Sequence, residues 1–133
     1  MSTANTDMAR RLIAAFDGSD ESVVEEVIHP EHRDHGPDEE GLGRDAVRES
    51  MRWVNATFGD RDTEIADLFA TDDRVVARVR FAATQIAALP TGLAATGRRF
   101  ETEHIHIWRV ADGQLAEHWM LRDDLGALAQ LQA

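Results

Sequence analysis

The rhythm of apolar and polar positions changes once along this chain. In its first part, apolar residues recur every three or four positions, as they do on one face of a helix. The first such stripe contains Met8, Leu12, Ile13 and Phe16, and a later one contains Val47, Met51, Val54 and Phe58. The pattern predicts helices over about residues 6–17, 22–28 and 45–57.

From about residue 63 the apolar positions alternate with polar ones, which is typical of strands. We expect strands over residues 63–70, 74–81, 99–110 and 115–123, with a tight turn at Asp112-Gly113 and a short closing helix. Helices followed by long antiparallel strands predict an α+β fold in a single domain over residues 1–133. The sheet must bury one face, and the N-terminal helices are the elements available to cover it.

The segment from His29 to Gly43 is polar and without period, so we expect an irregular, solvated loop. It contains three histidines spaced by three, together with two acidic residues: His29, His32, His35, Glu31 and Asp34. Such spacing could suggest a metal site, but Pro30 and Gly36 interrupt any helix that would bring the imidazoles together. We therefore expect no metal here, although His35 could still reach the mouth of a pocket.

The hairpin from Phe100 to Asp124 carries most of the groups suited to chemistry. On its first strand, His104, His106 and Trp108 share one face. A two-residue turn at Asp112-Gly113 would place these histidines on the face of Trp119 and Asp123, whereas a turn with a glycine bulge would place them with His118. We favour the first register, and with it a buried small-molecule pocket walled by this hairpin.

An aspartate beside a tryptophan on an inward face has a specific chemical use. Desolvation raises the pKa of a carboxyl group towards neutrality, so that Asp123 could take a proton from carbon and return it elsewhere. A nearby histidine could polarise a carbonyl group. The alternatives are that Asp123 only caps the final helix, that His104 and His106 are surface or structural residues, and that Trp53 packs in the core instead of lining the pocket.

Composition excludes several classes of protein. The chain has no cysteine, so thiolate nucleophiles, disulfides and iron–sulfur clusters are ruled out. A formal net charge of −11 disfavours nucleic acids and anionic membranes as partners. No apolar run is long enough to span a bilayer, and the N-terminus lacks the apolar segment of a signal peptide, so we expect a cytoplasmic protein. Motifs of serine hydrolases, P-loop enzymes and dinucleotide-binding folds are missing.

Three stretches together resemble a known family. They are the segment from His29-Pro30 to Asp34-His35-Gly36-Pro37, the loop from Leu89 to Arg98, and the ending Ile107 to Gly126 with its Asp-Gly turn and Glu-His-Trp sequence. Along nearly its whole length the chain resembles the SnoaL-like polyketide cyclases of the NTF2-like superfamily. The resemblance implies a cystatin-like cone, a curved antiparallel sheet wrapped around helices with a deep hydrophobic pocket, and a homodimer packed through its sheets.

The same resemblance implies cofactor-free acid–base chemistry, in which a ring closes by intramolecular aldol condensation. The family's acid and base corresponds to Asp123, its pocket histidine to His104 or His106, and its motif before the third helix to His35. Trp53 and Trp119 would help to bind the substrate.

Three functions follow as hypotheses. The leading one is an enzyme that uses Asp123, assisted by His104, on a hydrophobic keto or ester compound. The second is a non-catalytic small-molecule binding protein, or another reaction on the same fold, such as hydrolysis, dehydration, isomerisation or hydroxylation. The third is a mainly structural dimer with a filled interior.

Overall fold

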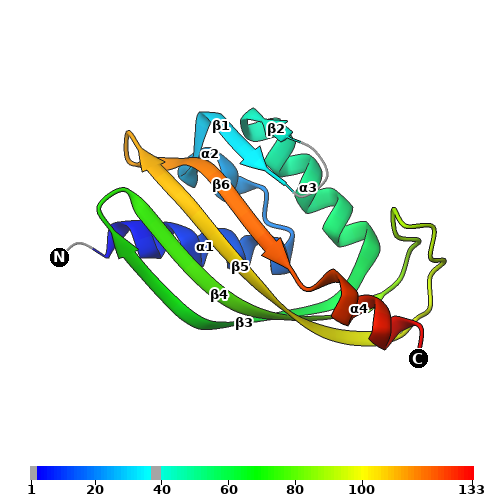
Figure 1. Cartoon of the computed structure of the whole chain (residues 1–133). Coiled ribbons are helices and arrows are strands. Elements are labelled where there is room, and N and C mark those ends of the chain that lie inside the picture. Colours follow the sequence, from blue (N-terminus) through cyan, green and yellow to red (C-terminus); the bar gives the residue numbers. More distant parts are fainter. Residues whose placement is uncertain (1–2, 37–39) are drawn as a thin grey trace.

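Helices come first along the chain and most of the sheet follows them (Figure 1). The computed structural model describes residues 3–36 and 40–133. The first part contains α1 (Ala4–Gly18), α2 (Ser22–Val27), β1 (Ile28–His35), β2 (Glu40–Leu42) and α3 (Gly43–Thr57). The second part contains β3 (Phe58–Thr71), β4 (Arg74–Gln85), β5 (Arg99–Ala111), β6 (Gln114–Arg122) and α4 (Asp124–Leu131).

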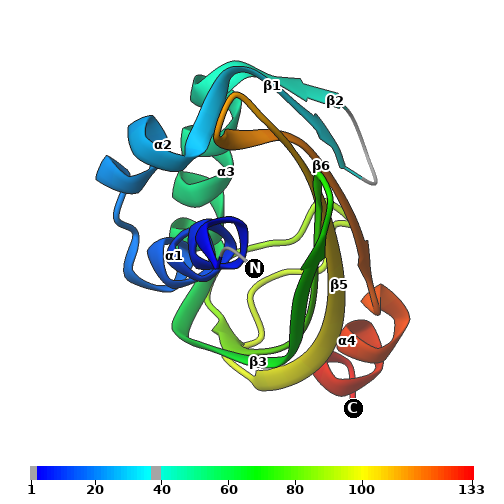
Figure 2. The same cartoon turned by 90° about the vertical axis from the view of Figure 1, so that its left-hand side faces the viewer.

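The six strands form one sheet in the order β2-β1-β6-β5-β4-β3. Figure 2 shows that the sheet curves around α1, α2 and α3 and does not close into a barrel. All neighbouring strands are antiparallel except β1 and β6, which run parallel. The predicted α+β architecture, a curved sheet wrapped around N-terminal helices, is confirmed.

The main hydrophobic core lies between the concave face of the sheet and the helices. Alternate residues of β4 and β5, among them Val75, Val79 and Trp108, are buried against the apolar stripes of α1 and α3. A second, smaller cluster around Phe100 and Leu131 packs near α4. The apolar face of the strands, with its period of two, thus packs against the apolar stripes of the helices, with their period of 3.6, in one layer of side chains.

The segment expected to be an irregular loop is in large part a strand, so that prediction is wrong. β1 lies inside the sheet, between β2 and β6, where its backbone groups are hydrogen-bonded on both sides. Its sequence hides this because the pairing with β6 is irregular between Ile28 and Arg33, the stretch that holds Pro30. Proline is tolerated at such irregularities, and it interrupts the alternation that identifies a strand. Residues 37–39 of this segment lie outside the described residues.

The hairpin turn has the predicted form, but the register beyond it does not. Asp112 and Gly113 both have positive φ, 52° and 72°, as a two-residue type I′ turn requires, and Ala111 pairs with Gln114. One step later, Val110 pairs with Leu115 while Arg109 pairs with Glu117, so Ala116 is an extra, unpaired residue. This bulge shifts the register by one, and Trp108 then lies opposite His118. The expectation that His104 and His106 share a face with Trp119 is therefore wrong.

Among the described residues, no helix combines the length and the apolar character needed to cross a bilayer.

Candidate functional site

Three imidazoles gather on the concave face of the sheet. His104 and His106 come from β5 and His118 comes from β6. The Phe81 ring lies 5.3 Å from that of His104, and the Trp108 ring lies 5.2 Å from that of His106. His104 and His106 keep part of their surface accessible. Trp108, the next residue on the same face of β5, is only 2% exposed. The row is thus polar at its accessible side and is flanked by aromatic rings.

Hydrogen bonds join two of these imidazoles to a carboxylate on β1. Nδ1 of His118 lies 3.0 Å from Oδ1 of Asp34, and Nε2 of His118 lies 2.8 Å from Nδ1 of His106. Register explains the meeting, because Asp34 is the cross-strand partner of His118 and His106 lies diagonally opposite it on β5. His104 makes a separate contact, 3.1 Å from its Nε2 to Oγ1 of Thr102.

The environment keeps the two β5 imidazoles uncharged. Burial lowers the pKa of His104 to about 4, helped by the nearby positive charge of Arg122. Burial also lowers the pKa of His106 well below 6.5, and repulsion from His118 and His104 adds to this. The carboxyl group of Asp34 behaves differently: desolvation opposes its ionisation, but the hydrogen bond and charge of His118 outweigh it, and the net pKa is lowered. Near pH 7 the site therefore combines two neutral imidazoles, those of His104 and His106, with the ionised carboxylate of Asp34.

Asp123, expected to be the acid and base, lies at the end of β6, where it caps α4. Its Oδ1 accepts a hydrogen bond of 2.9 Å from the backbone N–H of Gly126, and the residue is exposed. This is the geometry of the helix-capping alternative. Trp53 lies on α3 with 40% of its surface exposed, and its ring meets Phe58 edge-on at 5.6 Å.

Two other expected site residues lie on the opposite, convex face of the sheet. His35 and Trp119 are cross-strand partners whose rings stack 5.1 Å apart. Nε2 of His35 lies 2.8 Å from Oε2 of Glu117. The other carboxylate oxygen of Glu117, Oε1, accepts a hydrogen bond from Nε of Arg109. The structure thus brings His104 and His106 together and separates them from His35 and Trp119.

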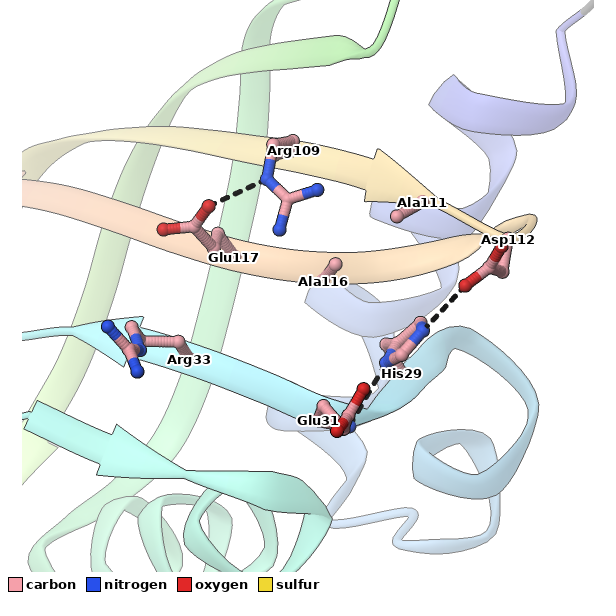
Figure 3. A pocket seen from close by; sticks show the side chains of 8 residues that line it. All are labelled: His29, Glu31, Arg33, Arg109, Ala111, Asp112, Ala116 and Glu117. Atoms are coloured by element: carbon pink, nitrogen blue, oxygen red, sulfur yellow. Dashed lines mark hydrogen bonds and ion pairs between the residues drawn. The ribbon is translucent and has the colours of Figure 1, made fainter.

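The convex face also carries a shallow hollow of about 400 Å³ between β1, β6 and the end of β5 (Figure 3). Most of its charged side chains are paired with one another or with neighbours: His29 with Asp112, Arg109 with Glu117, and Arg33 with Glu40. Within the described residues, no group of three or more histidine and acidic side chains could hold a metal ion. The three evenly spaced histidines do not share a partner. His29 contacts Asp112 and His35 contacts Glu117, while His32 bonds to the carbonyl oxygen of Leu115.

Sequence reasoning missed Asp34 and placed His118 only in the less favoured register. Asp34 was noticed only as part of the spaced-histidine segment, because nothing in the local pattern indicated a strand there. A cue for His118 was present, since the bulged register would have put it with His106. Both residues join the site through pairings between strands that are far apart in sequence.

Comparisons with known proteins define the class. The fold is that of a polyketide cyclase-like domain, and the model of the SnoaL-like polyketide cyclases matches residues 6–131. The chain belongs to this family. Its relatives are named cyclases, which supports the expectation of a polyketide cyclase-like enzyme.

Three relatives illustrate the similarity. Aklanonic acid methyl ester cyclase DnrD of Streptomyces peucetius is 31% identical over 129 residues, covering 94% of this chain and 88% of the relative. Nogalonic acid methyl ester cyclase of Streptomyces nogalater is 29% identical over 123 residues, covering 90% of this chain and 91% of the relative. Among solved structures, TsrD from Streptomyces laurentii is similar with a TM-score of 0.90 and 30% identity, covering 98% of this chain and 96% of that one.

Proposed function

We propose that this protein is a cofactor-independent cyclase that closes a ring in a hydrophobic polyketide keto ester by intramolecular aldol condensation. The observation that carries the proposal is the row of neutral imidazoles on the concave face, flanked by the rings of Phe81 and Trp108. The names of the relatives supply the substrate class, since aklanonic and nogalonic acid methyl esters are their substrates by name.

The chemistry needs one base and one acid in succession. The base removes a proton from the carbon next to a carbonyl group, the resulting enolate attacks a second carbonyl carbon within the same molecule, and the new alkoxide takes a proton back. Atoms are conserved, so the product is an isomer of the substrate. A neutral imidazole can accept the first proton and return it to the alkoxide, which is general acid–base catalysis at a single group.

Two groups are candidates for this role. Asp123 is the residue that the family resemblance indicates, but its carboxylate is exposed and bonded to the N–H of Gly126. His106 lies inside the concave face and is joined to a second imidazole and a carboxylate. The position of His106 favours it as the base. His104 lies beside it, and the N–H of its neutral ring could donate a hydrogen bond to the carbonyl oxygen of the substrate.

Conversion of aklanonic acid methyl ester by the purified protein tests the function. We expect a product of unchanged mass with a different retention time and absorption spectrum. His106→Asn provides an amide that can still donate to His118 but lacks the second ring nitrogen, and it should lower kcat by about 10²-fold or more. Asp123→Asn keeps a good helix cap, so loss of stability does not confuse its result.

The outcomes separate the candidates. If Asp123→Asn abolishes turnover while His106→Asn retains it, the carboxylate is the base and the imidazole assignment fails. If the wild-type protein raises its melting temperature in the presence of the ester but leaves it chemically unchanged, the non-catalytic binding function is the better one.

A homodimer packed through the sheets is part of the same proposal. A row of side chains crosses five strands on the convex face, formed by Phe69, Val76, Ile107, Trp119 and His35. Ile105 and Leu121 next to this row are 43% and 77% exposed. Contiguous apolar surface of this kind marks an interaction site, and a second copy would bury it.

A further inference from the structure

One chain of polar side chains runs across three strands and ends at the concave face. It begins at Asp34 on β1, passes through His118 on β6 and ends at His106 on β5. An ionised carboxylate only accepts hydrogen bonds, so the 3.0 Å contact fixes a proton on Nδ1 of His118. When His118 carries only this one proton, its Nε2 presents a lone pair, and Nδ1 of His106 donates to it over 2.8 Å.

In that state, the two hydrogen bonds place the proton of His106 on Nδ1. With its proton on Nδ1, the other ring nitrogen, Nε2, carries a lone pair. No described residue bonds to this Nε2, and His106 keeps part of its surface accessible. The exposed end of the chain is therefore a proton acceptor facing the interior.

Ring geometry supports proton movement between the two imidazoles. Their planes differ by 19° and their centroids are 5.1 Å apart, which with the short N···N contact describes two nearly coplanar rings joined edge to edge. In this arrangement the N–H of one ring points at the lone pair of the other. The Trp108 ring lies 5.2 Å from both imidazoles and fixes their orientation.

A base at this place meets an energetic obstacle, because a positive charge on His106 is disfavoured. Burial and the neighbouring imidazoles lower its pKa well below 6.5. The charge is better placed on His118, which is in direct contact with the Asp34 carboxylate. A proton accepted at His106 can reach that position by a single shift along the hydrogen bond.

We propose that Asp34, His118 and His106 form a proton relay in which His106 exchanges the proton with the substrate and the resulting charge is stored on the His118–Asp34 pair. The inference rests on the proposed function and specifies its acid–base machinery. In the forward step the substrate C–H bond breaks and an N–H bond forms at Nε2 of His106. The proton on Nδ1 of His106 moves to Nε2 of His118, which becomes an imidazolium beside the carboxylate. Reversal of both transfers delivers a proton to the aldol alkoxide.

His106 is the catalytic residue of this relay, and His118 and Asp34 are positioning residues. Nuclear magnetic resonance of protein labelled with ¹⁵N in its histidines reads the relay without any turnover. At pH 7.5 we expect the proton of His106 on Nδ1 and no proton on Nε2. In Asp34→Asn the side-chain amide can donate to His118, which reverses both hydrogen bonds and moves the proton of His106 to Nε2.

Kinetics with aklanonic acid methyl ester provide the second measurement. Asp34→Asn should lower kcat by about 10²-fold or more with little change in KM, because the substrate-contacting surface is retained while the base is lost. Asp112→Asn is the matched control, since it removes the carboxylate of another 3.0 Å histidine–aspartate contact, the one with His29 on the convex side. The control should leave both kcat and the His106 tautomer unchanged.

The two measurements test the relay and the proposed cyclase function separately. A wild-type His106 protonated on Nε2, or one whose tautomer does not respond to Asp34→Asn, overturns the relay even if the protein is a cyclase. If the tautomer is as expected but no ester is converted, the proposed function fails while the hydrogen-bond chain stands. Equal loss of kcat in Asp34→Asn and Asp112→Asn would also overturn the relay, because it would indicate a general structural effect.

Discussion

At the scale of single residues, burial disfavours positive charge on three of the histidines, His32, His104 and His106. His104 stacks on Phe81 and bonds to Thr102, and its pKa is lowered to about 4 mainly by burial. His32 and His106 have lowered pKa values for the same main reason. Each of these imidazoles is neutral in the folded state at a pH where the unfolded chain already binds protons.

This arrangement predicts a loss of stability in mild acid. The unfolded His104 titrates near 6.5 and the folded one near 4, so the free energy of unfolding should fall as the pH drops from about 6.5 to 4. One pKa unit corresponds to about 1.4 kcal/mol, so His104 contributes at most about 3.5 kcal/mol to the decrease. Urea unfolding at several pH values measures it.

His104→Phe serves as the comparison for this experiment, because it keeps an aromatic ring against Phe81 but cannot titrate. Its stability should depend less steeply on pH between 6.5 and 4 than that of the wild type. An unchanged slope would mean that His104 is accessible to protons in the folded state.

At the scale of elements, one unpaired residue decides which side chains form the site. The type I′ turn at Asp112-Gly113 was predicted correctly from its two residues, since few other pairs accept positive φ at both positions. The bulge at Ala116 was not predicted, because alanine has no preference that marks a bulge. Leu115 and His118 both reach the concave side only because the extra residue lies between them.

Deletion of Ala116 tests the role of the bulge. Glu117 would then follow Leu115 directly, so the hairpin becomes regular while Arg109 still pairs with Glu117 and Trp108 with His118. Side chains beyond the deletion keep their faces, so we expect cooperative thermal unfolding by circular dichroism, at a temperature lowered by the loss of the local twist that a bulge adds. Ala116→Gly keeps the bulge and should unfold cooperatively. Loss of cooperative unfolding in the deletion variant alone would contradict this and show that the fold needs the bulge itself as well as the register.

At the scale of the whole molecule, the two faces of the sheet differ in what they carry. The concave face packs on the helices and carries the imidazoles, while the convex face exposes apolar side chains around Ile105 and Leu121. A second copy placed on the convex face would cover this apolar surface without contacting the imidazoles on the concave side.

Leu121→Asp tests the dimer proposed for this face. A charge at this 77%-exposed position should shift the protein from dimer to monomer in light scattering coupled to size exclusion, because the charge would be buried without a partner. Leu125→Asp is the control, since Leu125 is 82% exposed but lies on α4. A monomeric wild type, or equal effects of the two substitutions, would contradict a dimer packed through the sheet.

The sequence by itself determined the features that depend on neighbours along the chain. These are the helical stripes, the alternation in β4 and β5, the turn at Asp112-Gly113, and hence the α+β class. Only the tertiary structure decided that His29 to Gly43 contributes a strand inside the sheet, that Asp34 meets His118, and that Trp119 faces away from His106. The physical reason is that side chains alternate along a strand with a period of two, so a single irregularity reverses every face beyond it, and a contact between distant strands leaves no periodic signal in either.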